Sequence, residues 1–410
     1  MKASSAGLRI ALLGHNLRAA GGLSVGRNVI ASLAHVADRH EYLLFAPAGV
    51  GYEAIEKPSR MTVHYFSRTR SGCGQMWFER VTMPRLIGGF QADVVWGLGN
   101  FGLRRPAAKQ AILLHKPHYI YGREFQRRDL WRYRLLNALG RRRLKRSLPT
   151  TQLVFCQTRT ACDRFRQTFG YTGRTALMPN AVSRLSLAGD AEQRPAMFDG
   201  LTGRFVLLCL TRYYAHKNLE ALADLFLHHG AALRDVVILL TIEAGHHPFA
   251  RRLIGRLSDA RLRDRLINVG PIDQSALAGY YTHCDGLILP TLLESFSGTY
   301  LEAMQFGRPI LTSDLDFARD VCGPAAIYFD PNDPAAIRDA ILALKGSPLM
   351  RDTLIAAGSE RMQTFFRNWD TIVADAIREL EGLVRDDREP VANGLVPSVI
   401  GPSQDRGIPV

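Results

Sequence analysis

Short apolar runs alternate with segments of helical periodicity along most of this 410-residue chain. The runs predict buried strands, each followed by a helix or a turn. In the first half, the predicted strands are residues 8–13, 42–46, 62–66, 93–96, 111–115, 152–156 and 175–178. In the second half, they are residues 205–210, 236–241, 266–269, 286–289, 309–312 and 326–329. This alternation predicts α/β domains, each with a doubly wound, mostly parallel sheet covered by helices.

A polar stretch with Gly and Pro divides the pattern in two. Residues 1–183 are expected to form the first Rossmann-like domain, residues 184–203 a linker, and residues 204–368 the second domain. The last helical pattern, residues 369–384, is expected to cross back onto the first domain. Residues 385–410 have turn formers and no period, which predicts a flexible tail.

Composition favours a globular protein, because 47% of the residues are hydrophobic. No segment approaches 18 uninterrupted apolar residues, and the N-terminus leads into a short strand, so neither a signal peptide nor a membrane span is expected. The six cysteines are scattered without metal-ligand spacing. We interpret them as reduced core thiols of a cytoplasmic protein.

The segment 289–309, LPTLLESFSGTYLEAMQFGRP, contains the most informative chemistry. It predicts the end of a buried strand, a loop, and a helix with Ser297 as its N-cap. The backbone N–H groups of Ser297, Gly298 and Thr299 would then point out of the helix start, where the macrodipole favours an anion. We therefore expect a phosphate group to bind there.

Two carboxylates, Glu294 and Glu302, bracket these amides with seven residues between them. Carboxylates repel a phosphate but accept hydrogen bonds from sugar hydroxyls, so they suit a phosphorylated sugar. A plain amphipathic helix with two solvated acids is the alternative. With Ala303-Met304 and Gly307-Arg308-Pro309, the pair resembles the Glu-x7-Glu motif of the GT4-like retaining glycosyltransferases of the GT-B fold.

That resemblance covers residues 8–384 and extends to two cations of the second domain. Arg212, after a predicted strand, and Lys217, at the next helix, are similar to the family residues that bind the donor diphosphate. Fixed cations and a helix N-terminus stabilise a leaving nucleoside diphosphate in place of a metal, so neither metal nor cofactor is expected. Exposed surface bases are the alternative. This chain departs from the family at Thr211, where Gly is usual, and at Ser297 in its ESFS sequence.

In the first domain, the resemblance is weaker. Gly21 and Gly22 follow the first strand and, by the resemblance, belong to a loop that faces the donor across the cleft. His115 falls at the carboxyl end of a strand, where ligands of parallel sheets bind, and it matches the family's cleft histidine by position. His115 is thus a catalytic candidate beside Glu294, and His118 is a candidate sugar or acceptor contact. An ordinary polar role is the alternative for both histidines.

Two motifs are set aside as chance. GLGNFG at 97–102 has the dinucleotide-binding spacing, but no helix is predicted to follow it. Asp314 and Asp316 have the form of a metal-binding Asp-x-Asp motif, but they follow a strand where the GT4 pattern needs no metal.

The net charge of +14 is concentrated in residues 104–146, which contain eleven Arg and three Lys against Glu124 and Asp129. Residues 129–148 predict a helix whose apolar positions 131, 135, 136, 139 and 144 pack into the domain and whose bases face outward. The bases expected to face a membrane are Arg132, Arg141, Arg142, Arg143, Lys145 and Arg146. An anionic membrane surface is the favoured partner, with nucleic acid or a plain solvated face as alternatives.

Together, these features predict a metal-independent retaining glycosyltransferase. It would transfer a hexose from a nucleotide diphosphate sugar to a glycan or lipid-linked acceptor, in the cytoplasm or at the inner membrane face, in polysaccharide or glycolipid synthesis. A phosphorylase or a sugar-nucleotide epimerase on the same fold is the alternative enzyme. A basic nucleic-acid-binding protein is the non-enzymatic alternative, although the block lacks regularly spaced aromatic residues.

Overall fold

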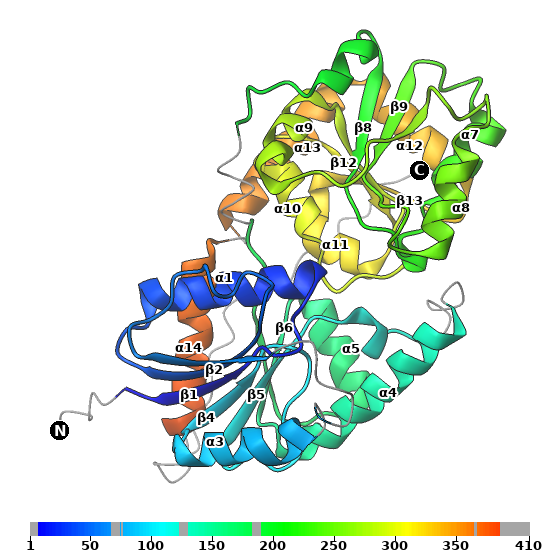
Figure 1. Cartoon of the computed structure of the whole chain (residues 1–410). Helices are drawn as coiled ribbons and strands as arrows, with labels where there is room; N and C mark the ends of the chain where they lie inside the picture. The colour runs from blue at the N-terminus through cyan, green and yellow to red at the C-terminus, as the bar shows by residue number, and fades with distance from the viewer. Residues whose placement is uncertain are drawn as a thin grey trace.

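The structure, a computed structural model, describes residues 7–66, 74, 77–122, 130–182, 190–364 and 367–385. Two lobes, each a sheet flanked by helices, stack one on the other (Figure 1). The first lobe has a seven-stranded sheet in the order β3-β2-β1-β4-β5-β6-β7, and the second has a six-stranded sheet in the order β10-β9-β8-β11-β12-β13. All strand pairs are parallel, so the predicted α/β architecture with two Rossmann-like sheets is confirmed.

The elements follow the predicted alternation in both lobes. Those of the first lobe are β1 (Arg9–Leu13), α1 (Ala20–Val36), β2 (Glu41–Pro47), β3 (Met61–Phe66), η1 (Phe78–Thr82), α3 (Met83–Gly89), β4 (Val94–Gly97), β5 (Lys109–Leu114), α4 (Trp131–Ser147), β6 (Leu153–Cys156), α5 (Arg159–Phe169) and β7 (Arg174–Leu177). Those of the second lobe are β8 (Phe205–Cys209), α7 (Glu220–His229), β9 (Val236–Leu240), α8 (Pro248–Arg256), β10 (Leu266–Asn268), α9 (Leu277–His283), β11 (Gly286–Leu289), α10 (Gly298–Gln305), β12 (Ile310–Ser313), α11 (Asp316–Cys322), β13 (Ala326–Phe329), α12 (Pro334–Gly346) and α13 (Pro348–Thr364). The last helix is α14 (Trp369–Arg385).

Successive side chains of β1 enter different parts of the core, because strand residues alternate between the two faces of a sheet. Ile10 and Leu12 share one apolar cluster with residues of α1 and α14, whereas Ala11 and Leu13 share another with η1 and α3. The helix α14 follows the second lobe in sequence and packs on the first. Its buried residues recur with the period of a helix that presents one apolar face.

The helix α4 is turned the other way from the prediction. Of its five predicted core residues, only Leu144 is buried, whereas Trp131, Leu135, Leu136 and Leu139 are 76%, 52%, 59% and 55% exposed. The predicted packing of its apolar face was therefore wrong. The buried positions of α4 are Asn137, Leu144 and Ser147. A Cβ on Gly140 would lie 2.2 Å from the Tyr119 hydroxyl, so a glycine is needed where this helix meets the domain.

The lobes contact one another through α5 and α11, which lie at their interface (Figure 1). The carboxylate of Asp316 accepts hydrogen bonds from the Tyr121 hydroxyl at 3.0 Å and from Arg164 Nε at 2.6 Å. The backbone N–H of Thr160 donates to Asp320 at 2.8 Å. Asp314 pairs with Arg319 of its own lobe. Both aspartates of the discounted Asp-x-Asp motif are thus bound by arginines.

The glycines of the discounted GLGNFG motif have a steric role. A Cβ on Gly97 would lie 2.3 Å from the Phe101 carbonyl oxygen, and one on Gly102 would lie 2.4 Å from the Gln110 side chain. No helix follows the motif, as predicted from the sequence. The motif therefore serves close packing of the segment between β4 and β5.

Other predictions differ in detail. α1 begins at Ala20, so Gly21 and Gly22 lie in its first turn and do not close the preceding loop as predicted. Within the predicted linker, Ala196–Leu201 forms a short 3-10 helix. Residues 386–410 of the predicted tail, and Cys73, lie outside the described residues. The other five cysteines are free and buried.

Candidate functional site

The start of α10 has the predicted geometry with one difference. Ser297 occupies the N-cap position with extended backbone angles, φ −105° and ψ 114°. Its hydroxyl lies 2.7 Å from the Thr299 hydroxyl and makes no capping bond to the backbone. A Cβ on Gly298 would meet no atom within 4 Å, so the space beside this helix start is open. The first N–H groups of α10 therefore remain suited to an anion.

Lys217 and Glu294 meet at this edge of the second sheet. Lys217 ends the short helix that follows β8, and Glu294 lies in the loop between β11 and α10. The Lys217 Nζ atom is 2.6 Å from Glu294 Oε2, and the two side chains are only 12% and 17% exposed. Both residues were predicted from the sequence to belong to one site, and in the structure they form an ion pair. Arg212 follows β8 nearby in sequence, and its side chain is exposed.

Glu302 is held by a residue that the sequence analysis did not identify. The Tyr281 hydroxyl donates to Glu302 Oε2 at 3.0 Å. Burial, and next the Glu302 carboxylate, raise the pKa of Tyr281 well above its usual value, so the phenol keeps its proton and remains a donor. Tyr281 also stacks on Phe306 with ring centroids 5.3 Å apart. The second carboxylate of the Glu-x7-Glu motif is thus fixed in orientation.

His115 directly follows β5, at the carboxyl edge of the first sheet. The side-chain oxygen of Asn100, a residue with a positive φ of 70°, accepts hydrogen bonds at 2.8 Å from the backbone N–H groups of both His115 and Lys116. Burial, with a further contribution from the Lys116 ammonium, lowers the pKa of His115 to about 4. The imidazole is therefore neutral near pH 7. Its Nδ1 atom has no hydrogen-bond partner among the described residues.

The two predicted glycines differ in their surroundings. A Cβ on Gly22 would lie 3.3 Å from Leu17 and 3.5 Å from His115 Nε2, so Gly22 packs against the imidazole. No atom lies within 4 Å of the same position on Gly21. Gly22 thus belongs to the immediate surroundings of His115, while Gly21 borders open space.

A hydrogen-bonded connection joins the two sides of the site. The Ser295 hydroxyl donates to the His115 carbonyl oxygen at 2.8 Å and lies 3.1 Å from the Gln157 amide oxygen. The Gln157 amide nitrogen donates in turn to Asn180 at 2.8 Å. Ser295 stands beside Glu294 in the chain, so this connection sets the histidine of one lobe against the carboxylate loop of the other. We call this region, from the α10 start to His115, the interlobe site.

His118 also reaches across the lobes. Its ring meets that of His216 edge to face, with centroids 4.8 Å apart. Burial, followed by the nearby His118 and Lys217, lowers the pKa of His216 well below its usual value. The sequence analysis missed His216, Ser295, Gln157 and Tyr281.

The basic residues of α4 are divided between two settings. Arg132, Lys145 and Arg146 are exposed, and Arg141 lies over the Phe169 ring, 5.5 Å from its centroid. Arg143 pairs with Glu79 at 2.9 Å. Arg142, Arg143 and Arg146 line a cavity.

No described helix is long and apolar enough to cross a membrane. In the described part of the chain, no cluster of three or more His, Cys, Asp or Glu could hold a metal ion.

Comparison with known protein families finds a match in each lobe. Residues 25–184 match the Glycosyltransferase Family 4 model, and residues 198–361 match the Glycosyl transferases group 1 model. A phosphatidyl-myo-inositol mannosyltransferase of Mycobacterium leprae is 28% identical over 139 residues, which are 32% of this chain and 37% of that protein. The aligned stretches span between about a third and about half of the curated relatives' length.

Solved structures share the two-lobed fold over their full length. The sucrose-phosphate synthase of Thermosynechococcus elongatus superposes with a TM-score of 0.72 at 20% identity, covering 92% of this chain and 100% of that one. The HepE protein of Anabaena, in complex with UDP and glucose, superposes with a TM-score of 0.66 at 15% identity, with coverages of 92% and 100%. At these identities, the likeness concerns the fold.

Proposed function

Because the chain belongs to the GT4-type glycosyltransferases, we propose that it moves a hexose from a nucleotide diphosphate sugar to a glycan or lipid-linked acceptor. The transfer would retain the anomeric configuration and need no metal ion. The observation that carries this proposal is the Lys217–Glu294 pair at 2.6 Å beside the start of α10. The Anabaena neighbour with bound UDP supports a nucleotide-sugar donor.

The donor diphosphate would lie between Lys217, Arg212 and the first N–H groups of α10. A departing diphosphate gains negative charge, and preorganised cations and dipoles stabilise that charge without reorganisation. Before the donor arrives, Lys217 and Glu294 satisfy each other in a partly buried place. Donor binding would move the ammonium contact from Glu294 to a phosphate oxygen, which frees the Glu294 carboxylate for the hydroxyls of the transferred sugar.

Glu302 would bind the ribose hydroxyls of the nucleotide. A carboxylate accepts two such hydrogen bonds when its own orientation is fixed. The Tyr281 hydroxyl supplies that restraint at 3.0 Å. The Glu-x7-Glu spacing then sets one carboxylate at the sugar end and the other at the nucleoside end of the same diphosphate.

Transfer would proceed on one face of the sugar. The bond between the anomeric carbon and the diphosphate oxygen breaks, the acceptor oxygen bonds to that carbon, and the acceptor proton passes to the departing phosphate oxygen. No protein nucleophile takes part. Neutral His115, with its carbonyl oxygen held by Ser295, would position the sugar by a hydrogen bond. His118 would contact the sugar or the acceptor.

The α4 helix would bring the enzyme to an anionic membrane surface on the cytoplasmic side. Its exposed side chains mix Trp131, Leu135 and Leu136 with neighbouring arginines. Apolar residues flanked by bases are typical of helices that lie in a membrane interface. This placement fits a lipid-linked acceptor and a role in cell-surface polysaccharide or glycolipid synthesis.

The donor can be identified by thermal unfolding with UDP-, GDP- and ADP-sugars. A ligand at about 100 times its dissociation constant stabilises the folded state by about 2.7 kcal/mol, so the matching donor should raise the unfolding temperature by several degrees. Incubation with that donor and candidate acceptors should then yield a glycoside with the donor's anomeric configuration. If no nucleotide sugar stabilised the protein, the proposal would be refuted.

Two other functions have distinct products. A phosphorylase would release free sugar phosphate, and a sugar-nucleotide epimerase would convert the donor with no acceptor added. A nucleic-acid-binding protein would bind duplex or single strands in a filter assay and would not float with anionic liposomes. The exposed apolar side chains of α4 favour the membrane over nucleic acid, because a nucleic-acid backbone offers them no apolar contact.

A further inference from the structure

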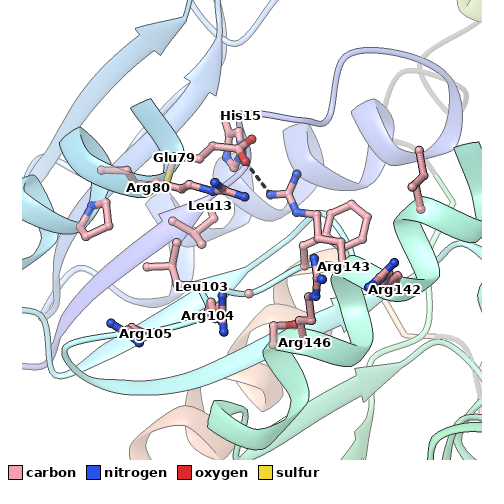
Figure 2. A pocket seen from close by; sticks show the side chains of 16 residues that line it. Leu13, His15, Glu79, Arg80, Leu103, Arg104, Arg105, Arg142, Arg143 and Arg146 are labelled. Atoms are coloured by element: carbon pink, nitrogen blue, oxygen red, sulfur yellow. Dashed lines mark hydrogen bonds and ion pairs between the residues drawn. The ribbon is translucent and has the colours of Figure 1, made fainter. Parts of the chain in front are cut away.

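A cavity of about 990 Å³ opens in the first lobe, between α4 and the helices η1 and α3 (Figure 2). Leu13 and His15, at the end of β1, form part of its wall. Six arginines line it: Arg80, Arg104, Arg105, Arg142, Arg143 and Arg146. Glu79 is the one carboxylate among the lining residues that the structure describes. We call this cavity the arginine pocket.

The arginines come from separate elements. Arg142 and Arg146 are four residues apart on α4, and Arg143 lies three residues before Arg146, so all three project from one helical stripe. Figure 2 shows them on one side of the cavity, with Arg104 and Arg105 from the β4–β5 connection on another. Distant parts of the chain thus place guanidinium groups around one volume.

The charge in the arginine pocket is only partly balanced. Glu79 lies 3.0 Å from His15 Nε2 and 2.9 Å from Arg143, so its single charge is already shared. In the described part of the chain, no carboxylate contacts Arg142 or Arg146. Guanidinium groups that line one cavity repel one another, and an anion among them offsets that repulsion. Their planar forks match phosphate oxygens, to which they donate pairs of hydrogen bonds.

A buried polar group lies beside one wall of the pocket. His15 is 6% exposed and lines the pocket, and its Nδ1 atom, which solvent does not reach, has no hydrogen-bond partner among the described residues. Buried polar atoms are nearly always paired, so this histidine leaves an unsatisfied polar atom next to the pocket. An anion in the cavity would contact the arginines and not this inaccessible atom.

Backbone contacts connect the wall of the arginine pocket with the interlobe site. The Asn16 amide donates to the Gly99 carbonyl at 2.7 Å, which joins the loops after β1 and β4. The next residue, Asn100, holds the backbone of His115, and Phe101 after it lines the pocket. β4 lies between β1 and β5, and neighbouring strands are spaced about 4.8 Å apart. The β1 edge of the pocket is thus roughly 10 Å from the strand end that presents His115.

From this arrangement we infer that the arginine pocket binds a phosphate group carried by the acceptor. The phosphate contacts Arg142 and Arg146, and the rest of the acceptor extends along the β4 and β5 ends towards His115. This inference rests on the proposed glycosyl transfer in one respect, that the ligand is the acceptor of the sugar. The phosphate site itself can be tested without any transfer. The phosphate could belong to a soluble sugar phosphate or to a lipid headgroup.

The test uses two double variants of the full-length protein. Arg142→Ala with Arg146→Ala removes two charges from the pocket. Arg141→Ala with Lys145→Ala removes the same charge from the same turns of α4, at residues that do not line the pocket. Binding of glycerol 3-phosphate is measured by calorimetry, and binding to phosphatidylcholine vesicles with or without phosphatidylinositol is measured by flotation. Circular dichroism verifies that both variants fold.

The pocket variant should bind one of these probes at least tenfold more weakly than the control variant does. Both variants lose the general attraction of two α4 bases to an anionic vesicle, so the difference between them measures the pocket. Loss with glycerol 3-phosphate identifies a soluble phosphate source, and loss confined to phosphatidylinositol vesicles identifies a lipid headgroup. Equal losses in the two variants, or no loss in either, would overturn the inference. If no donor supports transfer but the pocket variant alone loses phosphate binding, the proposed function fails and the phosphate site stands.

Discussion

The second-lobe half of the interlobe site and the arginine pocket of the first lobe both concentrate charge, but they differ in how that charge is balanced. Lys217 and Glu294 are largely buried and bound to each other, and Glu302 is fixed by Tyr281. In the arginine pocket, six arginines line the cavity with one carboxylate, Glu79, which pairs with Arg143 and His15. In the first arrangement the paired charges satisfy each other before a ligand binds, whereas the positive charge of the second exceeds that of its one carboxylate.

This difference corresponds to what each region would recognise. A diphosphate and a ribose are the same in every nucleotide donor, so residues fixed by short, buried contacts suit them. Acceptors vary, and a pocket built from a surface helix and loops can change without disturbing either sheet. The following variants test whether the two regions are separate in this way, from the largest expected effect to the smallest.

Replacing Lys217 by Ala should lower the rate of glycosyl transfer at least 100-fold, on the scale of losing one preorganised charge partner of a transition state. Initial rates with the matching donor provide the measurement. Lys345→Ala is the matched control, because Lys345 makes an ion pair of the same 2.6 Å length with Asp235, outside the interlobe site. Equal rates for the two variants would remove Lys217 from the mechanism.

Changing Leu135 and Leu136 together to Glu should reduce binding to anionic vesicles by at least about 30-fold. Each fully inserted leucine contributes roughly 2 kcal/mol, and each added carboxylate is repelled by the surface. The free energy of unfolding should change little, since both positions are more than half exposed. The control changes Leu349 and Met350, exposed on α13 of the second lobe, to Glu. Unchanged flotation of the α4 variant would exclude the exposed face of α4 as the membrane-binding surface.

Acidification should destabilise the protein through the buried His115. Its pKa in the folded state is about 4, below the value of about 6.5 in an unfolded chain, so the unfolded state takes up the proton first. The stability that neutral His115 contributes is present above pH 6.5 and is lost as the pH falls from about 6.5 towards 4. The His115→Gln variant should lose about 1–3 kcal/mol less of its unfolding free energy over this pH range than the unchanged protein does. Urea unfolding at several pH values measures the difference. An unchanged pH profile would contradict the buried neutral imidazole.

Replacing Asp316 by Ala should raise the KM for the donor about three- to fivefold with little change in kcat. The variant loses the bonds to Tyr121 and Arg164 that join the lobes, and contacts of this kind contribute about 1 kcal/mol. Asp314→Ala is the control, because Asp314 pairs with Arg319 inside the second lobe. A similar KM for both variants would mean that α11 has no part in lobe closure.

The two parallel sheets could be predicted because their strands are apolar on both faces and leave a strong local pattern. The start of α10 was also predictable, since a strand end, a cap residue and two spaced carboxylates lie within one short segment. The orientation of α4 could not be predicted in the same way. Periodicity identifies residues that share a helix face, but it does not say which face is buried. Here the buried face is made by Asn137, Gly140, Leu144 and Ser147.

The contacts that complete the interlobe site had no local signal. Ser295 and the His115 carbonyl are 180 residues apart, and Tyr281 and Glu302 are 21 residues apart. These pairs form only when the sheets set strand ends side by side. The arginine pocket had no local signal for the same reason. Arg142, Arg143 and Arg146 were predicted to face a membrane from α4, and nothing in the sequence indicates that the β4–β5 connection lies opposite them.

The Arg164–Asp316 pair between the lobes has one more consequence. Its side chains are 33% and 37% exposed, so dissolved ions reach both. At physiological ionic strength the Debye length is about 8 Å, and it falls to about 3 Å in molar salt. The bond from Ser295 to His115 involves uncharged groups in a partly buried place and is not screened in this way. The electrolyte around the protein therefore weakens the Arg164–Asp316 attachment between the lobes and leaves the Ser295–His115 attachment intact.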